Sequence, residues 1–319
     1  MKLSILSALL ICHAVTAGAE TVFVTLEKDN ALAVVDPISG TLMSTVPVGQ
    51  RPRGIAISPD GKTLYVATSD DDTIQVIDSE TMKVIGNLPS GEDPETFALS
   101  PDGTALFVSN EDDSMVTAID LKQGKVTKTV KVGVEPEGIT VSPDDRWLVS
   151  ATEATNMLHW IDRKTLEVVD NTLVDPRPRA LSFTADNQQL WVSSEMAGTT
   201  MVLDANTRQI VKTIKFEIPG VTEDLIQPVG VVIDSQRQKA YVALGPANRV
   251  AMINAQTLEV EKYFLVGQRV WNLAFSPDQK RLYTTNGVSN DISIIDLEKQ
   301  QVTKSIAVGR YPWGVAVKP

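Results

Sequence analysis

Residues 51–91 read RPRGIAISPDGKTLYVATSDDDTIQVIDSETMKVIGNLPSG, and this stretch decides the fold. Turn residues separate four short apolar runs, at residues 55–57, 64–67, 73–77 and 83–88. Ser58-Pro59-Asp60 is a turn signal, because proline presets a turn angle while serine and aspartate cap the turn with their side chains. The stretch predicts four consecutive β-strands.

The same pattern recurs about every 42 residues along the chain. An aromatic or apolar residue of the second strand returns at Phe23, Tyr65, Phe107, Val149, Trp191, Tyr241 and Tyr283. A polar residue closes the third strand at Asp36, Asp78, Asp120, Asp162, Asp204, Asn254 and Asp296. A period near 40 residues with four strands in each repeat is typical of propeller blades.

The order of strands predicts how the ring closes. The first repeat has only strands two to four, at residues 21–48, and the chain ends on a lone first strand at residues 313–317. We therefore predict an all-β, seven-bladed β-propeller of four-stranded blades over residues 20–319, closed by the C-terminal strand completing the first blade. About eight extra residues near 218–225 interrupt the period, and Pro219-Gly220 marks them as a loop.

Residues 1–19 are expected to be a secretory signal peptide, with Lys2 before an apolar run and Ala17-Gly18-Ala19 before the cleavage point. The protein is then periplasmic or secreted, and the cleaved chain has no cysteine, since Cys12 is the only one. The net charge of −11 is unfavourable for binding nucleic acid. We expect no membrane span and a monomer.

Several blocks resemble a known family. The second strands read Phe23-Val24-Thr25-Leu26, Tyr65-Val66-Ala67-Thr68, Phe107-Val108-Ser109-Asn110 and Tyr283-Thr284-Thr285-Asn286, and they resemble the YVTN β-propellers. Residues 134–138, 243–250, 266–271 and 308–314 are similar to exported β-propellers associated with pyrroloquinoline quinone (PQQ)-dependent catabolism. The resemblance implies a periplasmic partner, such as a quinoprotein dehydrogenase or another protein of alcohol oxidation. It implies no catalytic residues.

The repeat register predicts two rings of loops at one mouth of the propeller axis. The loops leading into strand one, here called lead-in loops, bring Arg51/Arg53, Asp93/Glu95, Glu135/Glu137, Arg177/Arg179, Gln227/Val229, Arg269/Trp271 and Tyr311/Trp313. The loops between strands two and three, here called hairpin loops, bring Glu27, Ser69, Glu111, Glu153, Glu195, Gly245 and Gly287.

Two interpretations of this mouth stand side by side. Guanidinium groups bind carboxylates through two parallel hydrogen bonds, so ion pairs would latch neighbouring blades. The expected pairs are Arg51/Arg53 with Asp93/Glu95, and Glu135/Glu137 with Arg177/Arg179. Alternatively the mouth binds a ligand. The candidate ligand-binding residues are Arg51, Arg53, Arg177, Arg179, Arg269, Trp271, Arg310, Tyr311 and Trp313. Arg269 has no acidic neighbour in its own ring, and aromatic faces beside guanidinium groups suit a flat anion such as PQQ.

The carboxylates of the hairpin loops permit acid–base or metal chemistry. Glu27, Glu111, Glu153 and Glu195 are weak candidate metal ligands, because their shared repeat position also explains them without chemistry. We assign no catalytic residue, and His159, which lies inside a third strand, is expected to be structural. We expect a non-enzymatic binding or scaffold protein. The alternative is an enzyme of lactonase or lyase type, with a metal held at the mouth by carboxylates and Asn286 or Asn110.

Overall fold

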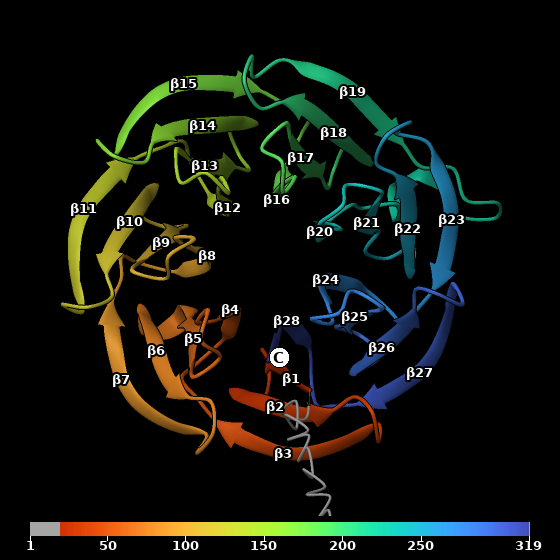
Figure 1. Ribbon diagram of the computed structural model, residues 1–319, viewed down its shortest axis with the longest axis horizontal. Coiled ribbons are helices and arrows are strands. Elements are labelled where there is room, and N and C mark those ends of the chain that lie inside the picture. The colour runs from red at the N-terminus through yellow and green to blue at the C-terminus, as the bar shows by residue number, and fades with distance from the viewer. Residues whose placement is uncertain (1–19, 319) are drawn as a thin grey trace, which may run out of the picture.

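The computed structural model describes residues 20–318, and in it seven four-stranded antiparallel sheets stand around one central axis (Figure 1). The all-β, seven-bladed prediction is confirmed. The expected signal peptide, residues 1–19, lies outside the described residues. In the part of the chain that the structure describes, no helix is long and apolar enough to cross a membrane.

In six blades the strands run in sequence order from the axis outward, and in the closing blade the last strand of the chain lies innermost, before the first three. Strand one, next to the axis, is β4 (Pro52–Ile57), β8 (Pro94–Leu99), β12 (Pro136–Val141), β16 (Pro178–Phe183), β20 (Val231–Ile233), β24 (Val270–Phe275) and β28 (Pro312–Lys318). Strand two is β1 (Thr21–Leu26), β5 (Thr63–Thr68), β9 (Ala105–Asn110), β13 (Trp147–Thr152), β17 (Gln189–Ser194), β21 (Lys239–Ala243) and β25 (Arg281–Asn286).

The two outer strands complete each blade. Strand three is β2 (Ala31–Asp36), β6 (Thr73–Asp78), β10 (Met115–Asp120), β14 (Met157–Asp162), β18 (Thr199–Asp204), β22 (Arg249–Asn254) and β26 (Asp291–Asp296). Strand four is β3 (Thr41–Pro47), β7 (Lys83–Pro89), β11 (Lys125–Lys131), β15 (Glu167–Leu173), β19 (Ile210–Lys215), β23 (Val260–Leu265) and β27 (Gln301–Ala307).

The ring closes as the strand count predicts. β28 pairs antiparallel with β1, in a register that joins Thr21 to Lys318 and Val22 to Val317. The red and blue ends of the ribbon therefore share one blade (Figure 1). Glu20 adds a tie to the last blade, because its carboxylate accepts a hydrogen bond of 2.5 Å from the Tyr283 hydroxyl. Closure pairs the free strands of the first and last repeats and removes an exposed edge.

The hydrophobic core is divided into layers between neighbouring blades. Each recurring residue of strand two is buried in a different layer, and these residues are Phe23, Tyr65, Phe107, Val149, Trp191, Tyr241 and Tyr283. Burial of such a side chain stabilises the fold by about 1.5–3 kcal/mol. The sequence repeat thus records one packing position that is filled once in each gap between blades.

The recurring Ser-Pro-Asp turn has one geometry throughout. The serine hydroxyl donates to the aspartate carboxylate at 2.6 Å in Ser58/Asp60, Ser100/Asp102, Ser142/Asp144 and Ser276/Asp278. The degenerate turn Thr184/Asp186 keeps the same bond. A side chain capping its own turn explains why these residues recur in the sequence.

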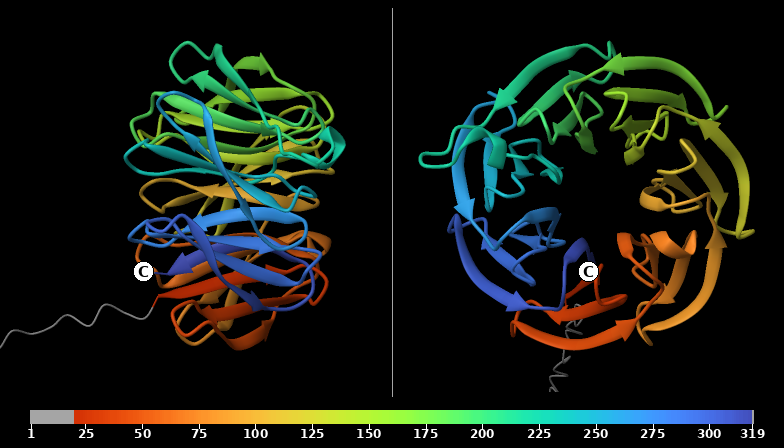
Figure 2. Two further views of the ribbon diagram at one scale, coloured as in Figure 1. Left: turned by 90° about the vertical axis from the view of Figure 1, so that its right-hand side faces the viewer. Right: turned by 180° about the vertical axis from the view of Figure 1, so that it is seen from behind.

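Glycines mark the places where strands one approach each other at the axis. A Cβ added to Gly54 would lie 2.7 Å from the carbonyl oxygen of Glu95, and one added to Gly138 would collide with that of Arg179. Only a residue without a side chain permits this approach. Within residues 20–318, an insertion at residues 216–230 interrupts the repeat; it contains a short 3-10 turn, η2 (Glu223–Leu225), and follows β19 as the teal loop that stands out from the ring (Figure 2).

Candidate functional site

The two predicted rings of loops are clasped together by backbone hydrogen bonds. In six blades the lead-in residue has a positive φ and its carbonyl oxygen accepts the N–H of the hairpin-loop residue at 2.8–3.2 Å. The pairs are Arg51/Ser69, Asp93/Glu111, Glu135/Glu153, Arg177/Glu195, Arg269/Gly287 and Tyr311/Glu27. Side chains of both rings therefore meet at one mouth of the axis. The exception is Gln227, which lies at the irregular loop.

On one side of the mouth, arginines of the second blade hold carboxylates of the third. Arg51 lies 2.7 Å from the Asp93 carboxylate and 2.9 Å from that of Glu95. Arg53 also pairs with Glu95, whose side chain is fully buried, and approaches Glu27 at 3.7 Å. These contacts match the predicted blade latch.

Glu111 lies beside this latch, and we call Arg51, Arg53, Asp93, Glu95 and Glu111 the Glu111 cluster. Carboxylate oxygens of Asp93, Glu95 and Glu111 all lie within 4.8 Å of one another. Burial, together with the negative charges of Glu95 and Glu137, raises the pKa of Glu111 to about 8. Glu111 is thus a half-buried carboxyl group that keeps its proton at neutral pH.

In the next two blades along the ring, one buried arginine binds three glutamates. Arg179 lies 2.5 Å from the Glu137 carboxylate, pairs with Glu153, and approaches Glu195 at 3.7 Å. Arg177 adds contacts of 2.8 Å to Glu153 and 3.0 Å to Glu195. We call Glu137, Glu153, Arg177, Arg179 and Glu195 the Arg179 cluster. Glu135, the other predicted partner, has no ion pair among the contacts of the described residues.

Burial raises the pKa of Glu137 within the Arg179 cluster. The nearby Glu153 carboxylate acts in the same direction, while the positive charge of Arg179 opposes it. The neighbouring carboxylates in turn raise the pKa of Arg179, against the effect of its own burial. Each glutamate here nevertheless contacts a guanidinium group, which distinguishes it from Glu111.

Arg269 is not free, contrary to what its own ring indicated. Its guanidinium group lies 3.1 Å from the Glu195 carboxylate of the other ring and donates to the Gln227 side-chain oxygen at 3.0 Å. It also stacks over the Trp271 ring, with 4.4 Å from guanidinium carbon to ring centroid. Comparing residues within the ring of lead-in loops does not reveal this pair, because Glu195 belongs to the ring of hairpin loops.

The remaining candidate ligand residues are dispersed. Arg310 is held by Asp29 at 2.5 Å on the exposed rim, and Tyr311 lies near Lys28. Trp313 is buried, and its ring centroid lies 5.6 Å from the Arg53 guanidinium carbon. The mouth thus contains Arg51, Arg53, Arg177, Arg179, Arg269, Trp271 and Trp313, while Arg310 and Tyr311 contribute only to its edge.

A small cavity lies at the axis beneath these groups. It has a volume of about 30 Å³ and is lined by Glu137, Arg179, Trp271, Asn272 and Trp313, together with Ala180, Val229 and Gly230. The indole N–H of Trp313 has no hydrogen-bond partner within the described residues. A water molecule requires roughly 10–15 Å³ on this measure, so the cavity has room for one or two waters beside that donor.

The predicted metal ligands do not form one site. Glu27, Glu153 and Glu195 are each within 4 Å of an arginine or lysine, and only Glu111 belongs to a carboxylate group compact enough for a cation. Arg51 occupies the same space, because it binds Asp93 and Glu95 at once. A divalent cation would compete with a guanidinium group, so the donor set fits a proton better than a resident metal.

Other predicted side chains are bound within their own blades or to the connection that leads into them. The Asn110 amide bonds to Ser90 and Thr117, and the Asn286 amide to Asp291 and Ser293. The His159 ring accepts the Gly133 N–H at 3.0 Å and contacts the Asn171 side-chain oxygen at 2.6 Å. Burial lowers the pKa of His159. This neutral, hydrogen-bonded ring agrees with the structural role expected.

The acidic half of the Glu111 cluster was placed in the rings by the sequence but was not recognised as a site. The sequence predicts Asp93 and Glu95 as latch partners and offers Glu111 as a weak candidate metal ligand, without joining the three. The available signal was the sequence 92–95, Glu-Asp-Pro-Glu, which sets acids where the preceding blade has Arg51 and Arg53. This acidic segment forms a candidate site only because Glu111 of the hairpin loop lies next to it.

The closed ring and its charged mouth define this protein as a seven-bladed β-propeller. The Choice-of-anchor I domain matches residues 113–274, just over half of the chain, and the chain therefore belongs to that family. The Lactonase family, described as a 7-bladed beta-propeller, matches residues 20–143, a segment that contains every member of the Glu111 cluster. No curated protein matches the sequence.

Solved structures with the same fold have low sequence identity. A putative 6-phosphogluconolactonase from Bacteroides fragilis is 16% identical, with a TM-score of 0.78 over 95% of this chain and 99% of that one. Hydrazine synthase from Kuenenia stuttgartiensis is 20% identical, with a TM-score of 0.74 over 83% and 89%. A functionally unknown protein from Desulfotomaculum acetoxidans is 14% identical, with a TM-score of 0.78 over 93% and 98%. At these identities the similarity establishes the fold alone.

Proposed function

We propose that the protein is a lactonase-type β-propeller that hydrolyses a cyclic ester at the axial mouth. The observation that carries the proposal is Glu111, a carboxyl group in the mouth that contacts other carboxylates and retains its proton at neutral pH. The Lactonase match over residues 20–143 supports this alternative above the non-enzymatic scaffold that we expected from the sequence. The link to PQQ-dependent oxidation stays a prediction from the resemblance.

Hydrolysis of a lactone needs a base and an acid. Water adds to the carbonyl carbon as the base removes one of its protons, and the ring C–O bond then breaks as the acid protonates the departing oxygen. Two carboxyl groups whose pKa values are set apart by their surroundings provide this combination. The product is a hydroxy acid, and its ionisation releases a proton to solvent.

We assign the acid to Glu111 and the base to Asp93. Asp93 is held by Arg51 at 2.7 Å, which favours its ionised form, although burial and the Glu95 charge raise its pKa. Glu111 has no guanidinium contact among the ion pairs of the described residues and keeps its proton. After each turnover solvent returns a proton to Glu111 and removes one from Asp93, which restores the starting state.

The test measures proton release from a panel of lactones, γ-butyrolactone, δ-valerolactone and glucono-1,5-lactone, with an enzyme-free blank. Glu111→Gln should lower kcat by about 10²–10⁴-fold, which is the usual contribution of a positioned acid or base. Asp112→Asn is the matched control, because it removes one carboxylate from the next, exposed position of the same loop. Full activity in Glu111→Gln would contradict the assignment, and absence of turnover with any lactone would contradict the function.

A further inference from the structure

All five arginines at the mouth are already bound by carboxylates. Their contacts are Arg51 to Asp93, Arg53 to Glu95, Arg177 to Glu153, Arg179 to Glu137 and Arg269 to Glu195. Phosphate recognition depends on guanidinium or ammonium groups that can turn their donors to the anion. At this mouth an incoming phosphate would have to displace a carboxylate from its partner.

The balance of charge acts in the same direction. Five guanidinium groups face seven carboxyl groups, which are Glu27, Asp93, Glu95, Glu111, Glu137, Glu153 and Glu195. With a proton on Glu111 alone, six carboxylates face the five guanidinium groups, and the mouth carries a net negative charge. A mouth of this kind offers a dianion no net attraction, and its potential does not steer anions inward.

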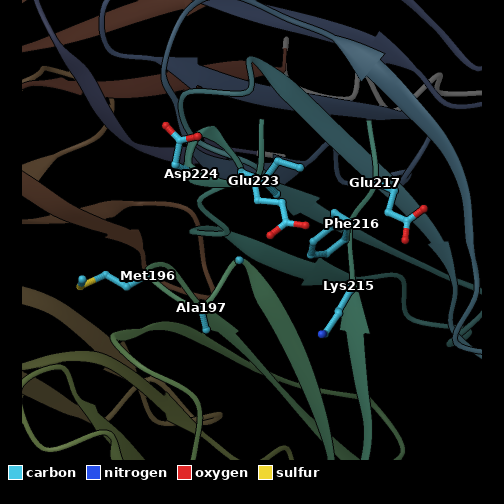
Figure 3. Close-up of a pocket in the computed structure, with 9 residues that line it drawn as sticks. Met196, Ala197, Lys215, Phe216, Glu217, Glu223 and Asp224 are labelled. Atoms are coloured by element: carbon cyan, nitrogen blue, oxygen red, sulfur yellow. The ribbon is translucent and has the colours of Figure 1, made fainter. Parts of the chain in front are cut away.

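The irregular loop places further acidic side chains around a second pocket (Figure 3). A pocket of about 250 Å³ lies between Met196 and Ala197 on one side and residues 223–226 on the other, with Phe216 beside them. Glu217, Glu223 and Asp224 bring three carboxylates to it, against the single ammonium group of Lys215. Met196 directly follows Glu195 and Ile226 directly precedes Gln227, so both walls continue from residues that hold Arg269.

We propose that the substrate is a lactone without phosphate or carboxylate groups, whose ring substituent is neutral or positively charged. This inference rests on the proposed lactonase function and names the substrate class of the same site. The class differs from that named for the Bacteroides fragilis structure of similar fold, a putative 6-phosphogluconolactonase. PQQ is a flat tricarboxylate, so by the same charge argument we expect the mouth not to bind it.

The first measurement compares glucono-1,5-lactone with its 6-phosphate, two substrates that differ only in the phosphate. We expect kcat/KM for the unphosphorylated lactone to exceed that for the phosphate ester by at least about tenfold, which corresponds to about 1.4 kcal/mol. Equal or faster hydrolysis of the phosphate ester would overturn the inference and leave the lactonase function intact.

A charge variant tests the cause of this selectivity. Glu195→Gln removes the carboxylate that Arg177 and Arg269 share, so each guanidinium gains donors for an anion. We expect the preference for the unphosphorylated lactone to fall by about threefold or more. Asp170→Asn is the control, since Asp170 pairs with Arg208 on an outer strand and not at the mouth. An unchanged preference in Glu195→Gln would contradict the electrostatic cause.

A binding measurement decides the charge class even if neither lactone is hydrolysed. Thermal-shift titrations of the wild-type protein with inorganic phosphate and with PQQ should give no stabilisation. Stabilisation by either anion that Arg269→Met abolishes would place an anion at the mouth and overturn the inference. Absent turnover together with absent stabilisation would reject the lactonase function while supporting the exclusion of anions.

Discussion

The two sides of the axial mouth contain the same residue types, and they differ in how the charges are matched. In the Arg179 cluster every carboxylate contacts a guanidinium group, and the buried Arg179 holds three of them. In the Glu111 cluster Asp93 and Glu95 are paired, while Glu111 lies beside them without an ion pair to any arginine or lysine of residues 20–318. The unpaired Glu111 is what distinguishes the candidate acid site from a structural latch. At this mouth, the ion pairs of the carboxylates therefore indicate chemical function better than the residue types do.

The largest expected difference between the two sides is in stability. Arg179→Met leaves Glu137, Glu153 and Glu195 with less compensation in a buried position, and we expect a loss of about 3–5 kcal/mol in the free energy of unfolding. Arg51→Met should cost less, because Arg51 is a quarter exposed and Arg53 still holds Glu95. Urea unfolding of both variants measures this, and equal losses would show that the two sides are equivalent latches.

The strands next to the axis approach each other closely at Gly138, beside the Arg179 cluster. Adding a side chain there should lower the free energy of unfolding. Gly138→Ala places a methyl group against the Arg179 carbonyl oxygen, and we expect a loss of about 1–3 kcal/mol. Gly86→Ala is the control, because no atom lies within 4 Å of the added methyl group on the outer strand β7. Urea unfolding measures both variants. An unchanged free energy of unfolding for Gly138→Ala would show that the neighbouring blades can move apart without loss of stability.

The pH dependence of hydrolysis distinguishes the two sides by activity. Since Glu111 acts as an acid with a pKa of about 8, kcat/KM should fall by about tenfold per pH unit above pH 8, and Glu111→Gln should lose this limb. Glu153→Gln, on the paired side, should keep it. An alkaline limb that Glu111→Gln retains would assign the titration to another group.

The smallest expected effect is a pH-dependent shift in melting temperature. The folded protein holds the Glu111 proton between the ordinary pKa of 4.5 and about 8, so this group lowers stability as the pH rises through that interval. Glu111→Gln cannot ionise, and its Tm relative to wild type should rise by a few degrees between pH 5 and pH 9. A constant difference across this range would indicate that Glu111 titrates normally.

Much of the fold was accessible from the sequence because its repeats are local. The Ser58-Pro59-Asp60 turn caps itself within three residues. Phe23 and Tyr65 occupy equivalent positions in two of the core layers between blades, and the same position recurs around the ring. The lone first strand at residues 312–318 required the closure that the structure shows. The register also placed Arg51 and Glu95 correctly as neighbours.

The candidate site was less accessible, because its contacts cross between rings. Arg269 and Glu195 are separated by 74 positions and belong to different loops, so no comparison within one ring pairs them. The buried position of Trp313 and the rim position of Arg310 likewise depend on the path of the last lead-in loop.

The sequence alone determined the repeat, the number of blades and the way the ring closes, because turns and alternating strands are encoded by neighbouring residues. Only the tertiary structure decided which carboxylates are matched by guanidinium groups and which one keeps a proton. Burial and charge proximity are properties of the assembled mouth, where Glu111, Glu95 and Glu137 from separate loops come together and raise the pKa of Glu111.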